Sequence, residues 1–230
     1  MVSGDSTAPG AQDDADIWTS IVSVDDHVVE PPMLWVDRLS HDDREVGPRV
    51  ERMRIRDAVK ESLLGVYRAL PIDEQSDGWI DIWRYEDVRF PMMRSYAAPG
   101  LTGDDEVTPI IYEDMRPGCY EPEMRLADMS TDGVDVSLCF PNIFVRFCGQ
   151  RFLEAKDKAL AERCVSAYND WLTDVWTASS DGRLHGAYII PLWDPQLAAR
   201  EVERIGKDAR AVCFSEIPSR LGLPSIYSGE

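Results

Sequence analysis

The chain has 230 residues, of which 44% are hydrophobic and 29% are charged, and this balance is ordinary for a soluble globular protein. Its formal net charge of −18 repels phosphate backbones and anionic lipid surfaces, which argues against nucleic acids and membranes as partners. No apolar run is long enough to cross a bilayer, and no secretory signal is recognisable at the start. Residues 1–18 are small, polar and acidic, so we expect a disordered tail before a single domain over 19–230.

The first predicted strand, 21–24, runs directly into Asp25-Asp26-His27. Three further short segments rich in β-branched and aliphatic residues are predicted strands, each closed by a proline or a polar turn. They are 134–140, 186–190 and 211–217. Their nearly continuous apolar character is typical of strands that are covered on both faces, as in a parallel sheet.

A long insertion, about 32–127, separates the first two strands. Its periodicity is weak, and a helix within 52–70 is the one element that it suggests. An insertion at the carboxyl end of a strand would form a lid or one wall of a substrate site. The alternative is a segment that only packs against the domain or forms an oligomer contact.

Helices are predicted between the later strands. Apolar residues recur at steps of three and four from 153 to 178, which predicts an amphipathic helix. Asp194 followed by Pro195 is typical of an N-cap with proline at the first helical position, and the predicted helix continues to about 205. The resulting βαβαβ pattern predicts an α/β fold with parallel strands.

The five cysteines are an odd number and form no CxxC pair, which argues against a disulfide framework and a structural zinc site. A reducing cytoplasm fits this usage best. Cys139, Cys164 and Cys213 lie in apolar segments and are interpreted as small buried hydrophobic residues.

Asp25 and His27 are the candidate metal ligands. Side chains alternate along a strand, so these two are expected on one face and Asp26 on the other. A carboxylate and an imidazole two residues apart suit a zinc, manganese or iron ion. The same spacing also fits a structural histidine that is merely hydrogen-bonded.

The motifs along the chain resemble the amidohydrolase-2, or ACMSD-like, family of metal-dependent hydrolases and decarboxylases. The stretch 22–32, VSVDDHVVEPP, is similar to the family's first strand, in which an acid or histidine stands two residues before a histidine. Shorter likenesses follow. They are RLADM at 125–129 with GVD at 133–135, YNDWL at 168–172, IPLWDP at 190–195 and ARAV at 209–212.

This resemblance implies a (β/α)8 TIM barrel, of which the chain holds about the first four β/α units. It also implies one divalent metal ion, zinc as the first choice and manganese or iron as alternatives, with Asp25 and His27 as its first two ligands. The family's later ligands, two histidines and an aspartate, have no counterpart here. His185 stands at the start of a strand and His41 in a charged run, so neither is assigned.

Three further residues are weaker candidates, and no catalytic residue is assigned. Glu30 is a candidate hydrogen-bond partner that would orient the metal-binding His27, with a loop or capping acid as the alternative. Asn142 and Trp193 follow strands at the carboxyl-end face and are candidate substrate-binding residues, with turn and packing roles as alternatives. Glu216 also lies at a strand end.

Three functions stay open from the sequence. The first is a metal-dependent hydrolase that attacks a small organic substrate with a metal-activated water, and the second is a nonoxidative carboxy-lyase with the same metal site. The third is an incomplete or non-catalytic scaffold subunit. A half-barrel exposes two sheet edges, so a homo-oligomer or a partner chain that completes the barrel is expected. A dinucleotide-binding module is excluded because no GxGxxG follows a strand.

Overall fold

The computed structural model describes residues 20–64, 73, 75–97, 108–225 and 227–228. The tail predicted over 1–18 lies outside these residues. Within the described ranges, no helix combines the length and the apolar content that spanning a membrane requires.

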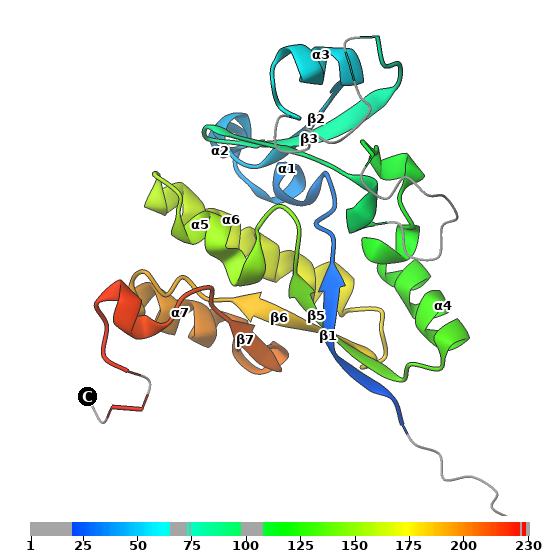
Figure 1. Cartoon of the computed structure of the whole chain (residues 1–230). Helices are drawn as coiled ribbons and strands as arrows, with labels where there is room; N and C mark the ends of the chain where they lie inside the picture. The colour runs from blue at the N-terminus through cyan, green and yellow to red at the C-terminus, as the bar shows by residue number, and fades with distance from the viewer. Residues whose placement is uncertain (1–19, 65–72, 74, 98–107, 226, 229–230) are drawn as a thin grey trace, which may run out of the picture.

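A four-stranded parallel sheet forms the centre of the fold (Figure 1). Its order is β1 (Val22–Val28), β5 (Val136–Pro141), β6 (Leu184–Ile189) and β7 (Ala211–Cys213), and each neighbouring pair is parallel. The predicted α/β class and all four predicted strands are thereby confirmed. The last strand is shorter than predicted, because the chain turns away after Cys213 and enters the short 3-10 helix η8 (Pro218–Leu221).

The sheet is open, with β1 and β7 as its two edges. Exposed apolar side chains lie on both edge strands: Val24 is 64% exposed on β1 and Val212 is 43% exposed on β7. Closure of this sheet into an eight-stranded barrel stays a prediction.

Four α-helices accompany the parallel strands. They are α4 (Pro122–Asp132), α5 (Gln150–Leu153), α6 (Lys158–Trp171) and α7 (Pro195–Ile205). The predicted cap of α7 is confirmed, because the Asp194 carboxylate accepts the backbone N–H groups of Gln196 and Leu197. The stretch predicted as one helix over 153–178 is instead α5, a break, α6 and a π-helical turn η6 (Leu172–Trp176).

Helix α6 and its π-helical turn cover one face of the sheet at close range. Gly186 of β6 packs directly under Leu172, and a Cβ atom on this glycine would lie 2.8 Å from both Leu172 methyl carbons. Next along the same face, the Tyr188 hydroxyl and the Thr173 hydroxyl are 3.0 Å apart. The absence of a side chain at Gly186 therefore sets how closely the helix approaches the sheet.

The insertion contains a small antiparallel sheet that the sequence analysis did not predict, of order β2-β3-β4. Its strands are β2 (Arg49–Arg54), β3 (Trp79–Tyr85) and β4 (Val88–Pro91). The helix suggested within 52–70 is α3, and it is short (Ile55–Lys60); residues 65–70 of that prediction lie outside the described residues.

The other helical segments among the described residues are short. They are α1 (Leu34–Arg38), α2 (His41–Val46), η2 (Arg94–Tyr96), η3 (Tyr112–Asp114), η4 (Pro117–Cys119), η5 (Phe147–Gly149) and η7 (Gly206–Asp208).

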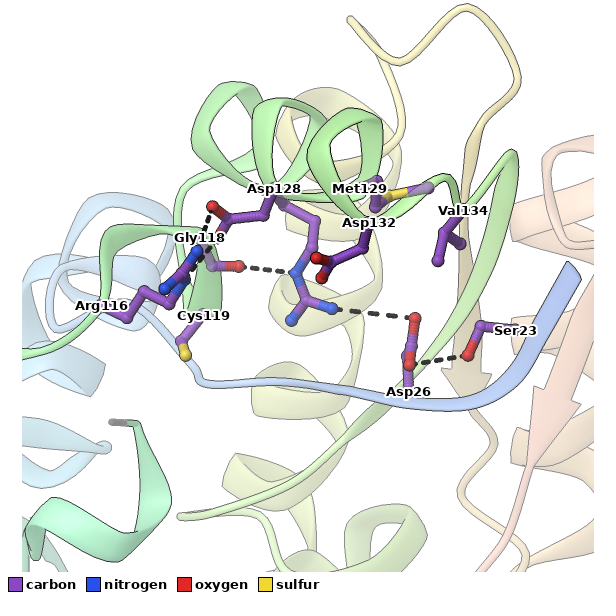
Figure 2. A pocket seen from close by; sticks show the side chains of 10 residues that line it. Ser23, Asp26, Arg116, Gly118, Cys119, Asp128, Met129, Asp132 and Val134 are labelled. Atoms are coloured by element: carbon purple, nitrogen blue, oxygen red, sulfur yellow. Dashed lines mark hydrogen bonds and ion pairs between the residues drawn. The ribbon is translucent and has the colours of Figure 1, made fainter. Parts of the chain in front are cut away.

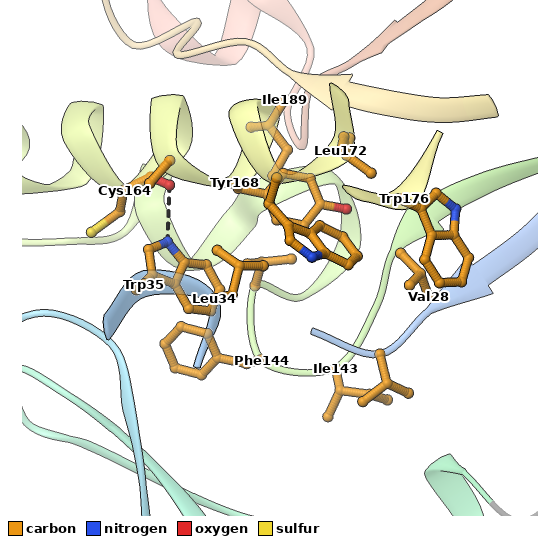
Figure 3. Close-up of a cluster of buried hydrophobic side chains, with 14 of the residues drawn as sticks. Val28, Leu34, Trp35, Ile143, Phe144, Cys164, Tyr168, Leu172, Trp176 and Ile189 are labelled. Atoms are coloured by element: carbon orange, nitrogen blue, oxygen red, sulfur yellow. Dashed lines mark hydrogen bonds between the residues drawn. The ribbon is translucent and has the colours of Figure 1, made fainter. Parts of the chain in front are cut away.

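The insertion sheet sits beyond the carboxyl ends of β1 and β5 and packs into the main core (Figure 1). One face, with Ile80 and Ile82, closes a small cluster with α3. The other face presents Trp83, whose ring stacks on Phe144 with centroids 4.8 Å apart. Phe144 follows β5 and also meets Trp35 of α1 edge-on, with centroids 5.4 Å apart (Figure 3). The insertion thus shares the main hydrophobic core and forms a wall at this end of the sheet.

Candidate metal site at the carboxyl end of the first strand

Asp25 and His27 lie side by side near the carboxyl end of β1. The Asp25 Oδ1 and His27 Nε2 atoms are 3.8 Å apart, and the two side chains are 88% and 42% exposed. His27 is the parallel partner of Phe140 in β5, and their ring centroids are 6.3 Å apart. The pair therefore stands on the sheet face that carries Phe140, at the strand end where parallel sheets place ligand sites.

Asp26 points the other way, as the alternation along a strand predicts. Its carboxylate accepts the Ser23 hydroxyl at 2.8 Å and the Ser137 hydroxyl of β5, and Arg125 Nη1 lies 3.8 Å from it. The pairing of β1 with β5 is irregular between Ser23 and Asp26, and the two serine hydroxyls hold Asp26 at this irregularity. Asp26 is thus tied into the scaffold, whereas its neighbours on either side are free to meet a ligand.

Behind β1, on the Asp26 side, is a polar cavity of about 320 Å³ between the strand and helix α4 (Figure 2). Across it, Arg116 binds Asp128 through two hydrogen bonds of 2.8 and 2.6 Å, which lower the pKa of that carboxyl. Arg125 donates to the carbonyl oxygens of Gly118 at 2.6 Å and of His27 at 2.7 Å. The guanidinium of Arg125 therefore fixes the backbone from which the His27 imidazole projects.

Glu30, just beyond β1, has a buried carboxylate that holds the loop after β5. Its two oxygens accept the backbone N–H groups of Asn142 at 3.1 Å and Phe144 at 3.0 Å. Burial raises the pKa of Glu30, and the backbone hydrogen bonds oppose that rise. The Tyr112 hydroxyl donates to the Glu30 carbonyl at 2.7 Å, which links the insertion to the same point. Support of His27 by Glu30 stays a prediction.

Asn142 and Trp193 lie at the ends of adjacent strands, but they have different neighbours. Asn142 is half-buried in the loop that Glu30 holds. Trp193 lines a small cavity of about 10 Å³ near Glu216, roughly the size of one water probe. The Lys158 ammonium lies 5.3 Å from the Trp193 ring centroid, and the indole Nε1 is buried without a hydrogen-bond partner in the described structure.

The other two histidines make no recorded contact with the Asp25–His27 pair in the described residues. His185 lies near the amino end of β6 and lines a different cavity of about 290 Å³. His41 is exposed in α2, where its Nδ1 is 3.4 Å from the carboxylate of Asp42. The described residues contain no group of three or more His, Cys, Asp or Glu side chains that is arranged to hold a metal ion.

No family model matches this sequence, and no curated protein does. The fold is similar to that of a solved amidohydrolase. That amidohydrolase comes from Mycobacterium avium subsp. paratuberculosis K-10, and its similarity to the present chain has a TM-score of 0.51 at 19% sequence identity. It covers 83% of the present chain and 47% of the amidohydrolase, so the chain spans about half the length of that structure.

The structural likeness shows a fold similar to part of that amidohydrolase, whereas membership of the ACMSD-like family stays a prediction. The donor chemistry of Asp25 and His27 suits a divalent cation, but zinc sites ordinarily use at least three protein ligands. This pair is therefore at most a part of such a site. Sequence reasoning missed the roles of Arg125 and Tyr112, because nothing in a single sequence indicates which distant carbonyl a side chain will reach.

Proposed function

We propose that the chain carries part of the active site of a metal-dependent hydrolase of the amidohydrolase type. The supporting observation is the Asp25–His27 pair, with Oδ1 and Nε2 3.8 Å apart, at the carboxyl end of the first strand of an amidohydrolase-like sheet. The two side chains would hold one divalent metal ion together with ligands from further polypeptide. When bound, such an ion lowers the pKa of a water molecule or polarises a substrate carbonyl.

In this proposal the chain's own residues position the ligands and shape the substrate side of the site. Arg125 fixes the His27 backbone through its 2.7 Å hydrogen bond to the carbonyl oxygen. Glu30 fixes the loop that carries Asn142, and the Trp83–Phe144 stack of the insertion forms the adjoining wall. The indole N–H of Trp193 is buried without a partner in the described structure, beside a cavity with room for about one water molecule.

The proposal also requires that the two open edges of the sheet be covered. The β1 edge carries Val22 and Val24, which are 54% and 64% exposed, and the β7 edge carries Val212. Further β/α units, on the same polypeptide or on a partner, would bury these side chains and bring the remaining metal ligands to the mouth of the barrel.

Metal binding tests the proposal directly. We expect Zn²⁺ titrated into the chain to bind weakly, with a heat signal in calorimetry that His27→Ala and Asp25→Asn each remove. The matched control is His41→Ala, because His41 and Asp42 form a second exposed His–Asp pair at 3.4 Å. Equal loss in the His41 variant, or no loss in the His27 variant, would remove the assignment.

Product analysis of the assembled protein separates the remaining functions. A hydrolase consumes water and releases an acid and an amine or alcohol, whereas a carboxy-lyase releases carbon dioxide. Turnover that depends on His27 with carbon dioxide as a product would favour the carboxy-lyase. Absence of both metal binding and turnover would favour a scaffold subunit.

A further inference from the structure

Two buried cysteines from different parts of the chain meet near the carboxyl end of the sheet. Cys148 lies in the loop after β5, and Cys213 is the last residue of β7. Cys148 and Phe214, the neighbour of Cys213, line the same small cavity, and the side chains of the two cysteines interact, which shifts the pKa of each. The contact lies outside the Asp25–His27 pair and has no part in the proposed function.

The backbone also brings the two cysteines to one corner of the sheet. Ile189 of β6 is the parallel partner of Cys213. Gly149, the neighbour of Cys148, lies so close to Ile189 that an added Cβ atom would be 2.6 Å from the Ile189 Cγ2 atom. The loop that carries Cys148 is therefore pressed against the corner of the sheet where Cys213 ends β7.

This loop holds an unfavourable backbone conformation. Cys148 has φ 49° and ψ 35°, Arg146 has φ 58° and Gly149 has φ 84°. Residues other than glycine rarely adopt a positive φ, and this conformation persists only where the surrounding structure enforces it. Here the enforced conformation holds Cys148 against this corner of the sheet, beside the small cavity that Trp193 and Glu216 also line.

The chemistry of the pair is asymmetric. The Cys213 thiol donates to the Ala187 carbonyl oxygen 3.5 Å away. Its interaction with Cys148 lowers the pKa of Cys148 and raises the pKa of Cys213. Burial instead raises the pKa of the other three thiols, Cys119, Cys139 and Cys164. Cys148 is thus the cysteine whose pKa is lowered, which favours its thiolate, the reactive form.

We propose that Cys148 and Cys213 are a redox pair that closes to an intramolecular disulfide when a peroxide oxidises it. The Cys148 thiolate attacks a peroxide oxygen, the O–O bond breaks, and a sulfenic acid and hydroxide are formed. The Cys213 thiol then attacks the Cys148 sulfur, the S–O bond breaks, and water leaves with the Cys213 proton. In total, two thiols and one hydrogen peroxide give one disulfide and two waters, and a dithiol reductant reverses the step.

The test uses the whole reduced chain and hydrogen peroxide as the probe. After oxidation, free thiols are blocked with N-ethylmaleimide in denaturant, and the chain is digested with trypsin without reduction. Cleavage after arginine places Cys148 in peptide 147–151 and Cys213 in peptide 211–220. We expect these two peptides to appear joined, with the mass of two hydrogens lost, and to separate on reduction.

Three variants locate the chemistry. Cys148→Ser is expected to abolish the linked peptide, and Cys213→Ser to leave a Cys148 sulfenic acid that dimedone traps. Cys164→Ser is the matched control, because Cys164 is also fully buried but its pKa is raised mainly by burial, and the linked peptide is expected to remain. Oxidation of the unfolded wild-type chain in urea should lose the preference for this pair, because the fold creates the proximity.

The wild-type peptide map decides the outcome even if a serine variant fails to fold. Disulfides that join Cys119, Cys139 or Cys164 in preference to this pair would overturn the proposal. So would sulfinic acid at Cys148 without a linked peptide, or five thiols that all stay reduced while methionines are oxidised.

Discussion

Asn169 of α6 hydrogen-bonds to both backbone groups of Ile189, at the end of β6. Its side-chain nitrogen donates to the Ile189 carbonyl at 2.9 Å, and its side-chain oxygen accepts the Ile189 N–H at 3.0 Å. The same nitrogen also donates to Glu201 of α7 at 2.7 Å. One amide thereby joins two helices to the strand end that leads to Trp193, and it replaces the partner that a sheet neighbour would supply.

Replacing Asn169 by alanine should destabilise the fold strongly. The change leaves the Ile189 N–H and C=O groups buried without partners, and we expect the free energy of unfolding to fall by about 2–4 kcal/mol. Urea denaturation followed by circular dichroism measures the loss. Gln196→Ala on the exposed surface of α7 is the control and should change stability little. A loss as small as that of the control would show that water replaces the Asn169 amide.

Glu30 should make stability depend on pH in a defined direction. Its pKa in the folded chain is raised above the ordinary value of 4.5, so the folded state holds the proton more tightly than the unfolded state. The Glu30 contribution to stability is therefore greatest below the unfolded pKa and declines as pH rises toward the folded pKa. Glu30→Gln removes this titration, so the stability of wild type relative to the variant should decrease from pH 4.5 upward.

Urea denaturation of both proteins between acidic and neutral pH measures this difference. The comparison within one pair of proteins cancels the titration of the other carboxyl groups, which the two share. A wild-type advantage that grows with rising pH would mean that the loop amides of Asn142 and Phe144 outweigh burial, contrary to the expected direction.

Two arginines on strand β2 should differ in their contribution to stability. Arg52 makes hydrogen bonds of 2.8 and 2.9 Å to the carboxylate of Asp81, whose side chain is only 2% exposed. Arg54 instead pairs with Asp77, which is 89% exposed, and stacks on Trp79. Because Arg52→Ala leaves a buried carboxylate with fewer partners, we expect a loss of about 2 kcal/mol, discounted for the partial exposure of Arg52.

Arg54→Ala is the matched control on the same strand and should cost about 0–1 kcal/mol. Equilibrium unfolding of the two variants under identical conditions gives the comparison. If Asp81→Asn restores the stability of Arg52→Ala, the cost arises from the buried charge; if it does not, the cost arises from lost packing.

The sequence was informative where burial alone determines the structure. The later parallel strands β5, β6 and β7 are largely apolar, so their positions were predictable, and the Asp194-Pro195 cap is a local signal that needs no distant partner. The alternation around Asp25 and His27 likewise predicted that the two would share a face, and they lie 3.8 Å apart.

The insertion shows why the rest was not predictable. Strand β2, RVERMR, has four charged residues among its six, and it forms because β3 pairs with it and Asp81 binds Arg52 from that neighbour. The left-handed loop at Cys148 and the role of Asn169 also depend on contacts between distant segments. No local pattern encodes such contacts, and the candidate site is built largely from them.

The closeness of Gly186 to Leu172 leads to a final prediction about how α6 lies on the sheet. A methyl group at residue 186 would stand 2.8 Å from both Leu172 methyl carbons, well inside ordinary contact. Gly186→Ala should therefore push the π-helical turn away from β6 and lower the free energy of unfolding by about 1–3 kcal/mol.

Leu172→Ala alone should also destabilise the fold, because Leu172 is fully buried. The double variant, however, removes the clash, so it should be more stable than the two separate losses predict by at least about 0.5 kcal/mol. Simple additivity in a double-mutant cycle measured by urea unfolding would contradict a direct contact between these two residues.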